Sequence, residues 1–118
     1  MSEETEITSE EAYKKRYDSV LLTARGVIAK VLTDDKEGST HQRFILTTPS
    51  KQTLLILNNL ERSYRLPIET GQNVEVKGLY RWNDLGGLIH ETHHDSRATH
   101  QDGWIILTDI NKRNSPKQ

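Results

Sequence analysis

The chain has no cysteine, so it can form neither a disulfide nor a thiolate metal site. Any metal ion that it binds must therefore use histidine, aspartate or glutamate as ligands. Long apolar runs are also missing, and hydrophobic residues make up only 33% of the 118 residues. Because a membrane-spanning helix needs about 20 consecutive apolar residues, the sequence predicts no such span and a single domain with a small core.

A large excess of one charge is missing as well, since the formal net charge is -1. The signs are nevertheless separated: Met1 to Glu11 contains five acidic residues and no basic one, whereas the C-terminal end is basic. The remainder is nearly neutral, which argues against strong non-specific binding to a phosphate backbone but allows a local basic face. The N-terminus lacks the basic and then apolar pattern of a secretory signal, so we expect a cytoplasmic protein.

Patterns typical of β-strands dominate the middle of the chain. From Val74 to Trp82 every second residue points to one face, which predicts a half-buried strand. The branched residues from Val20 to Leu32 predict a long strand with a bend or bulge at Gly26. Further strands are expected at 41–46, 53–57, 88–92 and 104–107.

Thr8, followed three residues later by Glu11, is typical of a helix N-terminus and predicts a short helix to about Asp18. Two hairpins are separated by a connection at 58–71 that is long enough for one helical turn. These elements favour a mainly β fold, a small five- to six-stranded OB-type β-barrel with a short N-terminal helix. The predicted parts are an acidic arm and helix at 1–18, the barrel domain at 19–110 and a basic tail at 111–118.

Four of the five histidines lie in one short string, which reads H-E-x-x-H-x-x-R-x-x-H from His90 to His100. The string is one residue away from the zinc signature of the metzincin proteases, in which His90, His94 and His100 would bind zinc and Glu91 would be the general base. That chemistry requires the first two histidines to lie one turn apart on a helix.

The surroundings of this string argue against a helix. Gly86 and Gly87 precede it and favour a hairpin turn, and Arg97 stands where the signature has glycine. The only methionine is Met1, so the downstream Met-turn of these proteases is missing. We therefore expect a strand at His90 and interpret the metzincin spacing as accidental.

A metal site on another scaffold remains open, because imidazoles with a carboxylate suit zinc or manganese. The candidate ligands are His90, His94, His100 and Asp102, and further candidates are His41 and His93. Metal-free acid and base chemistry would instead use His93 or His94 with Asp95. The alternative is that these histidines are exposed loop residues, or donors that fasten the loop by hydrogen bonds.

Nucleic-acid binding by an OB-type barrel usually needs exposed aromatic side chains among basic ones. The aromatic candidates are Tyr80, Trp82 and Trp104, and the basic candidates are Arg43, Arg65, Lys77 and Arg81. Tyr80 and Trp82 share a face with two valines, so at least one of them is expected in the core. Arg81 lies on the opposite face, which is either a binding surface or an ordinary solvated one.

Several short segments occur together: HQRF at 41–44, WNxxGG at 82–87, IHxTHHD at 89–95 and DGW at 102–104. Through this combination residues 20–107 resemble a bacterial family of domains of unknown function. Members of that family are small β-domains, so the resemblance implies an OB-like fold and a strand at His90. It brings no established activity.

The sequence thus favours a small OB-like binding module for nucleic acid or another oligomeric ligand, with single-stranded nucleic acid as the expected partner. The alternative is a metal-dependent, nuclease-like hydrolase that uses the His and Asp cluster, with zinc or manganese as cofactor. A third hypothesis is a non-catalytic domain whose oppositely charged ends bind partners. Fold-level analogy is a weak guide to function, so whether the protein is an enzyme stays open at this point.

Overall fold

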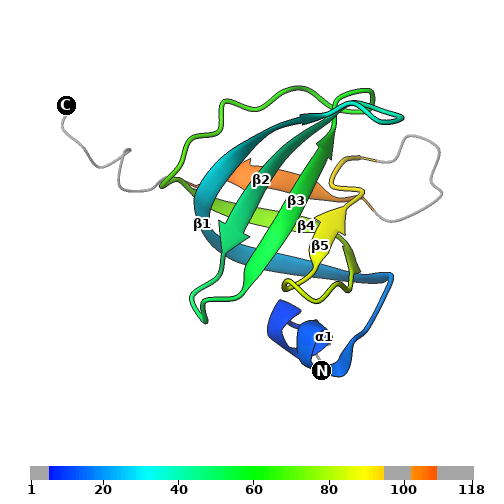
Figure 1. Cartoon of the computed structure of the whole chain (residues 1–118), viewed down its shortest axis with the longest axis vertical. Coiled ribbons are helices and arrows are strands. Elements are labelled where there is room, and N and C mark those ends of the chain that lie inside the picture. Colours follow the sequence, from blue (N-terminus) through cyan, green and yellow to red (C-terminus); the bar gives the residue numbers. More distant parts are fainter. Residues whose placement is uncertain (1–5, 95–101, 109–118) are drawn as a thin grey trace.

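The computed structural model describes residues 6–94 and 102–108, in which the chain forms one short helix and six strands (Figure 1). The elements are α1 (Ser9–Lys15), β1 (Val20–Asp35), β2 (His41–Thr47), β3 (Thr53–Asn59), β4 (Asn73–Arg81), β5 (Leu88–His90) and β6 (Trp104–Leu107). Several predicted boundaries are wrong: the first strand continues to Asp35, the third continues to Asn59, and the fifth ends at His90 instead of Thr92. The predicted acidic arm and basic tail lie largely outside the described residues.

Five strands close into a ring in the order β1-β2-β3-β5-β4, because β4 pairs back onto β1. β3 and β5 are parallel, and the other pairs are antiparallel. β6 is added to β4 beside β5. The prediction of a mainly β fold of five to six strands that close on themselves, with a short N-terminal helix, is confirmed.

The long strand β1 closes the ring by serving two partners. Its first half, from Val20 to Val27, pairs with β4, and its second half pairs with β2. The change of partner takes place beside Gly26, where a side chain would collide with the carbonyl oxygen of Thr47. The sequence predicts a bend or bulge at this glycine. The structure shows that the backbone of β2 approaches it too closely for any Cβ, and the register with β2 shifts a little later, between Ile28 and Lys30.

The core fills the inside of the ring with every second residue of the strands. The buried hydrophobic residues are Ala12, Leu22, Ala24, Ile28, Phe44, Leu46, Leu54, Ile56, Val74, Val76, Tyr80 and Ile89. Tyr80 is therefore the core member of the pair that the sequence could not separate. The residues between these positions face outward, and they form the surfaces on which a ligand could bind.

The helix α1 lies against one end of the ring (Figure 1). Thr8 caps it as predicted, since its Oγ1 accepts a hydrogen bond from the amide of Glu11 at 3.0 Å. The helix ends earlier than predicted, because Arg16 takes a left-handed conformation with φ of 58°. Within the described residues, no helix is long and apolar enough to cross a membrane.

A buried polar network attaches the long connection between β3 and β4. Gln42 and Asn58 are both buried, and the Gln42 Oε1 atom accepts hydrogen bonds from Asn58 Nδ2 and from the amide of Leu66, each at 3.0 Å. Gln42 Nε2 donates in return to the carbonyl of Leu66 at 2.8 Å. Residues 60–72 contain no helix, and these hydrogen bonds hold the connection in place.

Candidate functional site

The chain turns sharply after β5, and the turn brings two imidazole rings to one carboxylate. Glu91 Oε1 lies 3.2 Å from His93 Nε2, and its Oε2 lies 3.8 Å from His90 Nδ1. Glu91 has a positive φ of 55°, a conformation uncommon for a residue with a side chain. Such strain persists only where the surroundings impose it, so the position of this carboxylate is determined by the fold.

His93 is the most enclosed of these imidazoles, with 5% of its side chain exposed. Its Nδ1 lies 3.0 Å from the carbonyl oxygen of His94, and its Nε2 faces Glu91. Both ring nitrogens are therefore turned toward oxygens of the protein. This geometry suits a residue that fastens the segment, which is one of the alternatives left open by the sequence.

The backbone after β5 is also clamped by its neighbours. Thr92 Oγ1 donates to the carbonyl of Leu57 at 2.7 Å, and the amide of Gly103 donates to the carbonyl of His93 at 2.9 Å. Gly78 in β4 has no room for a side chain, because a Cβ there would collide with the carbonyl of the last residue of β5. A glycine at position 78 therefore lets the end of β5 lie close against β4.

His94 and Asp102 form an exposed pair on the same side of the molecule. His94 Nδ1 lies 2.8 Å from Asp102 Oδ2, and the two side chains are 75% and 53% exposed. A carboxylate in this position orients the imidazole and leaves Nε2 as the nitrogen that can take up a proton or bind a ligand. Asp102 returns to the histidine segment as the sequence predicted.

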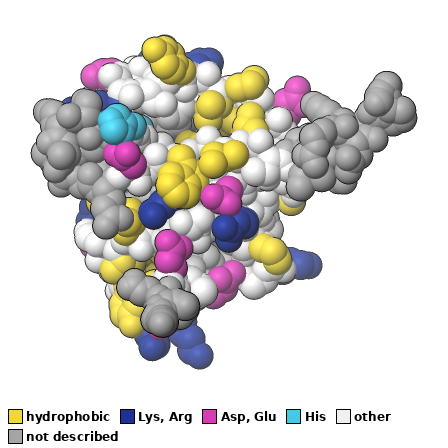
Figure 2. All heavy atoms as spheres, turned by 180° about the vertical axis from the view of Figure 1, so that it is seen from behind, with side chains coloured by type: hydrophobic (Ala, Val, Ile, Leu, Met, Phe, Trp, Pro, Cys, Tyr) yellow, Lys and Arg dark blue, Asp and Glu magenta, His cyan; other side chains and the backbone are white. Residues whose placement is uncertain are grey.

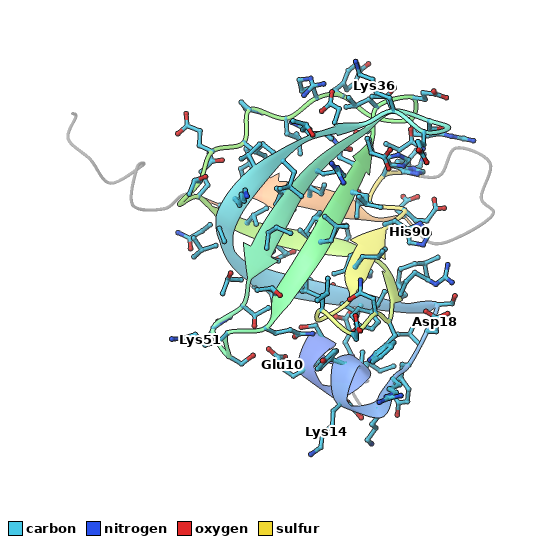
Figure 3. All side chains as sticks on the ribbon, viewed as in Figure 1. Glu10, Lys14, Asp18, Lys36, Lys51 and His90 are labelled. Atoms are coloured by element: carbon cyan, nitrogen blue, oxygen red, sulfur yellow. The ribbon has the colours of Figure 1, made fainter. Side chains whose placement is uncertain are left out.

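The predicted metal ligands are only partly brought together. His94 and Asp102 meet, whereas His90, labelled at the end of β5 in Figure 3, faces Glu91. Within residues 6–94 and 102–108, no group of three His, Asp or Glu side chains is arranged to hold a metal ion. The described residues therefore give no support to the predicted zinc or manganese site.

The other histidine predictions have separate outcomes. His41 begins β2, and its Nδ1 lies 3.0 Å from the carbonyl oxygen of Ser39, so it fastens the turn before its own strand. His100 and Asp95 lie outside the described residues. His90 lies in a strand, as expected from the glycine-rich turn before it, and is the last residue of that strand.

Trp82, a predicted ligand-binding residue, attaches α1 to the ring. Its Nε1 donates to the carbonyl of Tyr13 at 3.0 Å, and its ring stacks on the Tyr13 ring with 6.1 Å between centroids. The guanidinium of Arg16 covers the Trp82 ring at 4.8 Å. These contacts come from residues of α1 and its end, so much of the indole is used within the molecule.

Arg81 precedes Trp82 and points outward from the end of β4. Its Nε donates to Asp18 Oδ1 at 2.9 Å, and the amide of Trp82 donates to the same oxygen at 3.0 Å. The bond from Arg81 is the main reason why the pKa of Asp18 lies below its ordinary value. Arg81 therefore carries a positive charge with an exposed acidic neighbour.

Trp104 is the centre of a mixed surface on the outer side of β4 and β6. Lys77 lies opposite it in the sheet, with Nζ 5.0 Å from the centroid of the indole ring. Trp104 Nε1 donates to Glu75 Oε2 at 2.9 Å, and Glu75 Oε1 accepts from Arg25 Nε at 2.9 Å. We call this surface, made of Arg25, Glu75, Lys77 and Trp104, the aromatic face.

Figure 2 views the molecule from behind and shows hydrophobic side chains near the middle, with acidic and basic side chains around them. The role of Glu75 in this surface is missing from the sequence-based candidates. Its signal was present, however, because Glu75 and Lys77 are alternate residues of the most regular strand and must share its outer side.

Arg43, the fourth predicted ligand-binding residue, lies elsewhere. It points outward from β2, its Nε donates to the carbonyl of Thr33 at 2.9 Å, and it lines a groove of about 360 Å³. The four predicted residues thus occupy three places: the end covered by α1, the aromatic face and this groove. Of these four residues, only Trp104 is an aromatic side chain that lies among basic side chains on the surface of a strand.

Comparison with known proteins gives a family and no activity. The family model described as "Protein of unknown function (DUF3465)" matches residues 2–113, which is nearly the whole chain. No curated protein and no solved structure matches the chain. The chain therefore belongs to the DUF3465 family.

Proposed function

We propose that the domain is a binding module for an oligomeric ligand, single-stranded nucleic acid, and that it binds this ligand on the aromatic face. The observation that carries the proposal is the arrangement of Trp104, whose ring lies on the outer side of the sheet beside Lys77. Single-stranded nucleic acids are bound by aromatic rings that stack on bases and by cations that neutralise phosphates.

The Glu75 carboxylate supports this role by holding two groups of the face. It accepts hydrogen bonds from the indole of Trp104 and from the guanidinium of Arg25. The Arg25 side chain is 71% exposed, so its charge remains accessible to a phosphate. A ring and a cation that are already oriented lose less conformational freedom when a ligand binds.

Arg81 extends the basic character along β4, since it lies on the same outer side as Lys77, four residues further on. Each of these cations has an acidic neighbour: Arg25 has Glu75, Arg81 has Asp18, and Lys77, whose side chain is 17% exposed, has Glu6 at 3.9 Å. We therefore expect moderate affinity and a shallow dependence on salt, because few phosphates are neutralised.

The test is fluorescence anisotropy with labelled single-stranded DNA and RNA at low salt. Trp104→Ala should weaken binding by roughly 10-fold or more, because one base loses its stacking partner. Lys77→Gln should weaken binding less and lower the slope of log affinity against log salt by about 1. The matched control is Tyr64→Ala, which removes an aromatic side chain that is 87% exposed but lies on the connection between β3 and β4.

Two results would contradict the proposal: no binding of either nucleic acid at low salt, or equal affinities of Trp104→Ala and the unchanged protein. Retained folding is checked by circular dichroism for each variant. Among the described residues, imidazole and carboxylate groups meet at His94 with Asp102 and around Glu91, but no group of three is arranged to hold a metal ion, so we do not advance the metal-dependent hydrolase as the function.

A further inference from the structure

A second outer surface of the ring is aliphatic. Ile45 in β2 lies opposite Leu55 in β3, and Leu55 lies opposite Leu88 in β5. All three are partly exposed, and they alternate with the buried residues of their strands. Leu57 continues the surface on β3. We call these four residues the aliphatic face; their strands lie side by side on the near side of Figure 1.

The aliphatic face contains the groove of about 360 Å³. Its lining residues include Leu32, Ile45, Leu55 and Leu85. Leu85 is 79% exposed although it lines this groove. A single exposed leucine is ordinary, but an exposed leucine next to other outward aliphatic side chains forms a patch of the kind that interaction sites use.

Leu85 is presented by a rigid turn. Asn83 Oδ1 accepts hydrogen bonds from the amides of Leu85 and Gly87, both at 2.9 Å. The carbonyl of Gly86 accepts from Tyr80 Oη at 2.9 Å and from Gln52 Nε2 at 2.9 Å. An anchor that is already fixed in position loses little conformational entropy on binding.

The charges beside the groove are complementary. Arg43 lines the groove, and Asp84, an exposed residue, directly precedes Leu85 in the chain. The surface therefore combines an apolar groove that carries one basic side chain with an exposed leucine whose neighbour in the chain is acidic. The groove and Leu85 lie on the same side of the chain. A second copy of the chain, related by a two-fold axis, can therefore place its Leu85 against the groove of the first copy and receive Leu85 of the first copy in its own groove.

We propose that the aliphatic face is a self-association surface, through which two copies of the chain form a two-fold symmetric dimer. Leu85 of each copy enters the groove of the other, and Asp84 of each copy approaches Arg43 of the other. Nucleic acid does not suit this surface, because its outward side chains are aliphatic and cannot stack on bases as aromatic rings do. The aromatic face takes no part in this contact, so the proposal is independent of the proposed function.

The first test is sedimentation velocity of the full chain over a wide range of concentrations. The unchanged protein should move from monomer to dimer as concentration rises. Leu85→Asp should raise the dimer dissociation constant by at least about 30-fold, as expected for the loss of a central anchor. The matched control is Tyr64→Asp, which places the same charge at an apolar position that is 87% exposed on the connection between β3 and β4; it should leave the dimer unchanged.

The second test exchanges the charges. Arg43→Asp and Asp84→Arg each place like charges opposite one another and should each weaken the dimer roughly 10-fold. The double variant restores opposite charges and should recover most of the affinity. Circular dichroism and thermal unfolding show whether each variant is folded. A protein that stays monomeric at every concentration, or a dimer that tolerates Leu85→Asp, overturns the proposal; a double variant as weak as the single ones overturns the assigned contact of Asp84 with Arg43.

Discussion

The aromatic face and the aliphatic face are built in the same way from different residues. Both consist of outward side chains that alternate with one shared core. On the outer side of β4, however, the outward residues Glu75 and Lys77 are charged, whereas Ile45 in β2 and Leu55 in β3 are aliphatic. A ring of strands can therefore carry two distinct surfaces without any change of fold, and we expect that each surface can be altered separately.

The largest expected effect comes from the core that both faces share. Phe44 is fully buried in β2, so Phe44→Ala should destabilise the protein by about 3 to 5 kcal/mol through lost burial and a cavity. That loss is comparable with the whole stability of a small domain, so nucleic-acid binding and self-association should fail together. Urea unfolding measures the change.

Val31→Ala is the matched control for this variant. Val31 lies opposite Phe44 on the neighbouring strand but is 41% exposed, so its truncation should cost much less. If Phe44→Ala removed the function of one face and spared the other, the faces would not depend on a common core, and the comparison would fail.

The next largest effect is expected for Tyr80, which supports the turn beside the aliphatic face and does not contact the aromatic face. Its hydroxyl donates to Gly86 in the turn that presents Leu85, and burial raises its pKa to about 12. Because an unfolded tyrosine ionises near pH 10, the stability that Tyr80 contributes is present below about pH 10 and is lost between about pH 10 and 12. Tyr80→Phe should remove this alkaline loss and cost about 1 kcal/mol at neutral pH.

The measurement is urea unfolding of both proteins at neutral and alkaline pH, in which the difference between them isolates Tyr80 from the lysines. Tyr80→Phe should also weaken self-association, since the turn of Leu85 loses a hydrogen bond, while nucleic-acid affinity should stay the same. An identical alkaline slope in the two proteins, or an equal effect on both faces, would show that Tyr80 does not serve the turn as described.

Much of the fold could be predicted because it depends on local patterns. The alternation from Val74 to Trp82 identified β4, and Thr8 identified the start of α1, since strand periodicity and helix capping are written in neighbouring residues. Gly26 also stood out in the sequence, although the reason for a glycine there, the carbonyl of Thr47, lies 21 residues away and is visible only in the structure.

The site was harder to predict because it depends on contacts between distant segments. Trp82 was an equal candidate with Trp104 in the sequence, and only the packing of Tyr13, 69 residues away, shows that Trp82 holds α1. Glu91 and His93 carry no local sign of their contact, which requires a left-handed turn in a residue type that rarely adopts it.

The smallest expected effect concerns Asp18, which pairs with Arg81 at the end of the ring that α1 covers. The hydrogen bond from Arg81 lowers the pKa of Asp18, so its contribution to stability is present above the unfolded value near 3.9 and is lost as pH falls through the lower folded value. Both side chains are about half exposed, so solvent screens the pair and the contribution is small. Asp18→Asn should be slightly less stable than the unchanged protein at pH 7, and the urea midpoints of the two should converge in acid.

The same change removes the acidic neighbour of Arg81, so affinity for single-stranded nucleic acid should rise slightly while self-association is unaffected. An offset between the two midpoints that stays constant from neutral to acid pH would mean that the Asp18 side chain acts through its shape and not through its charge.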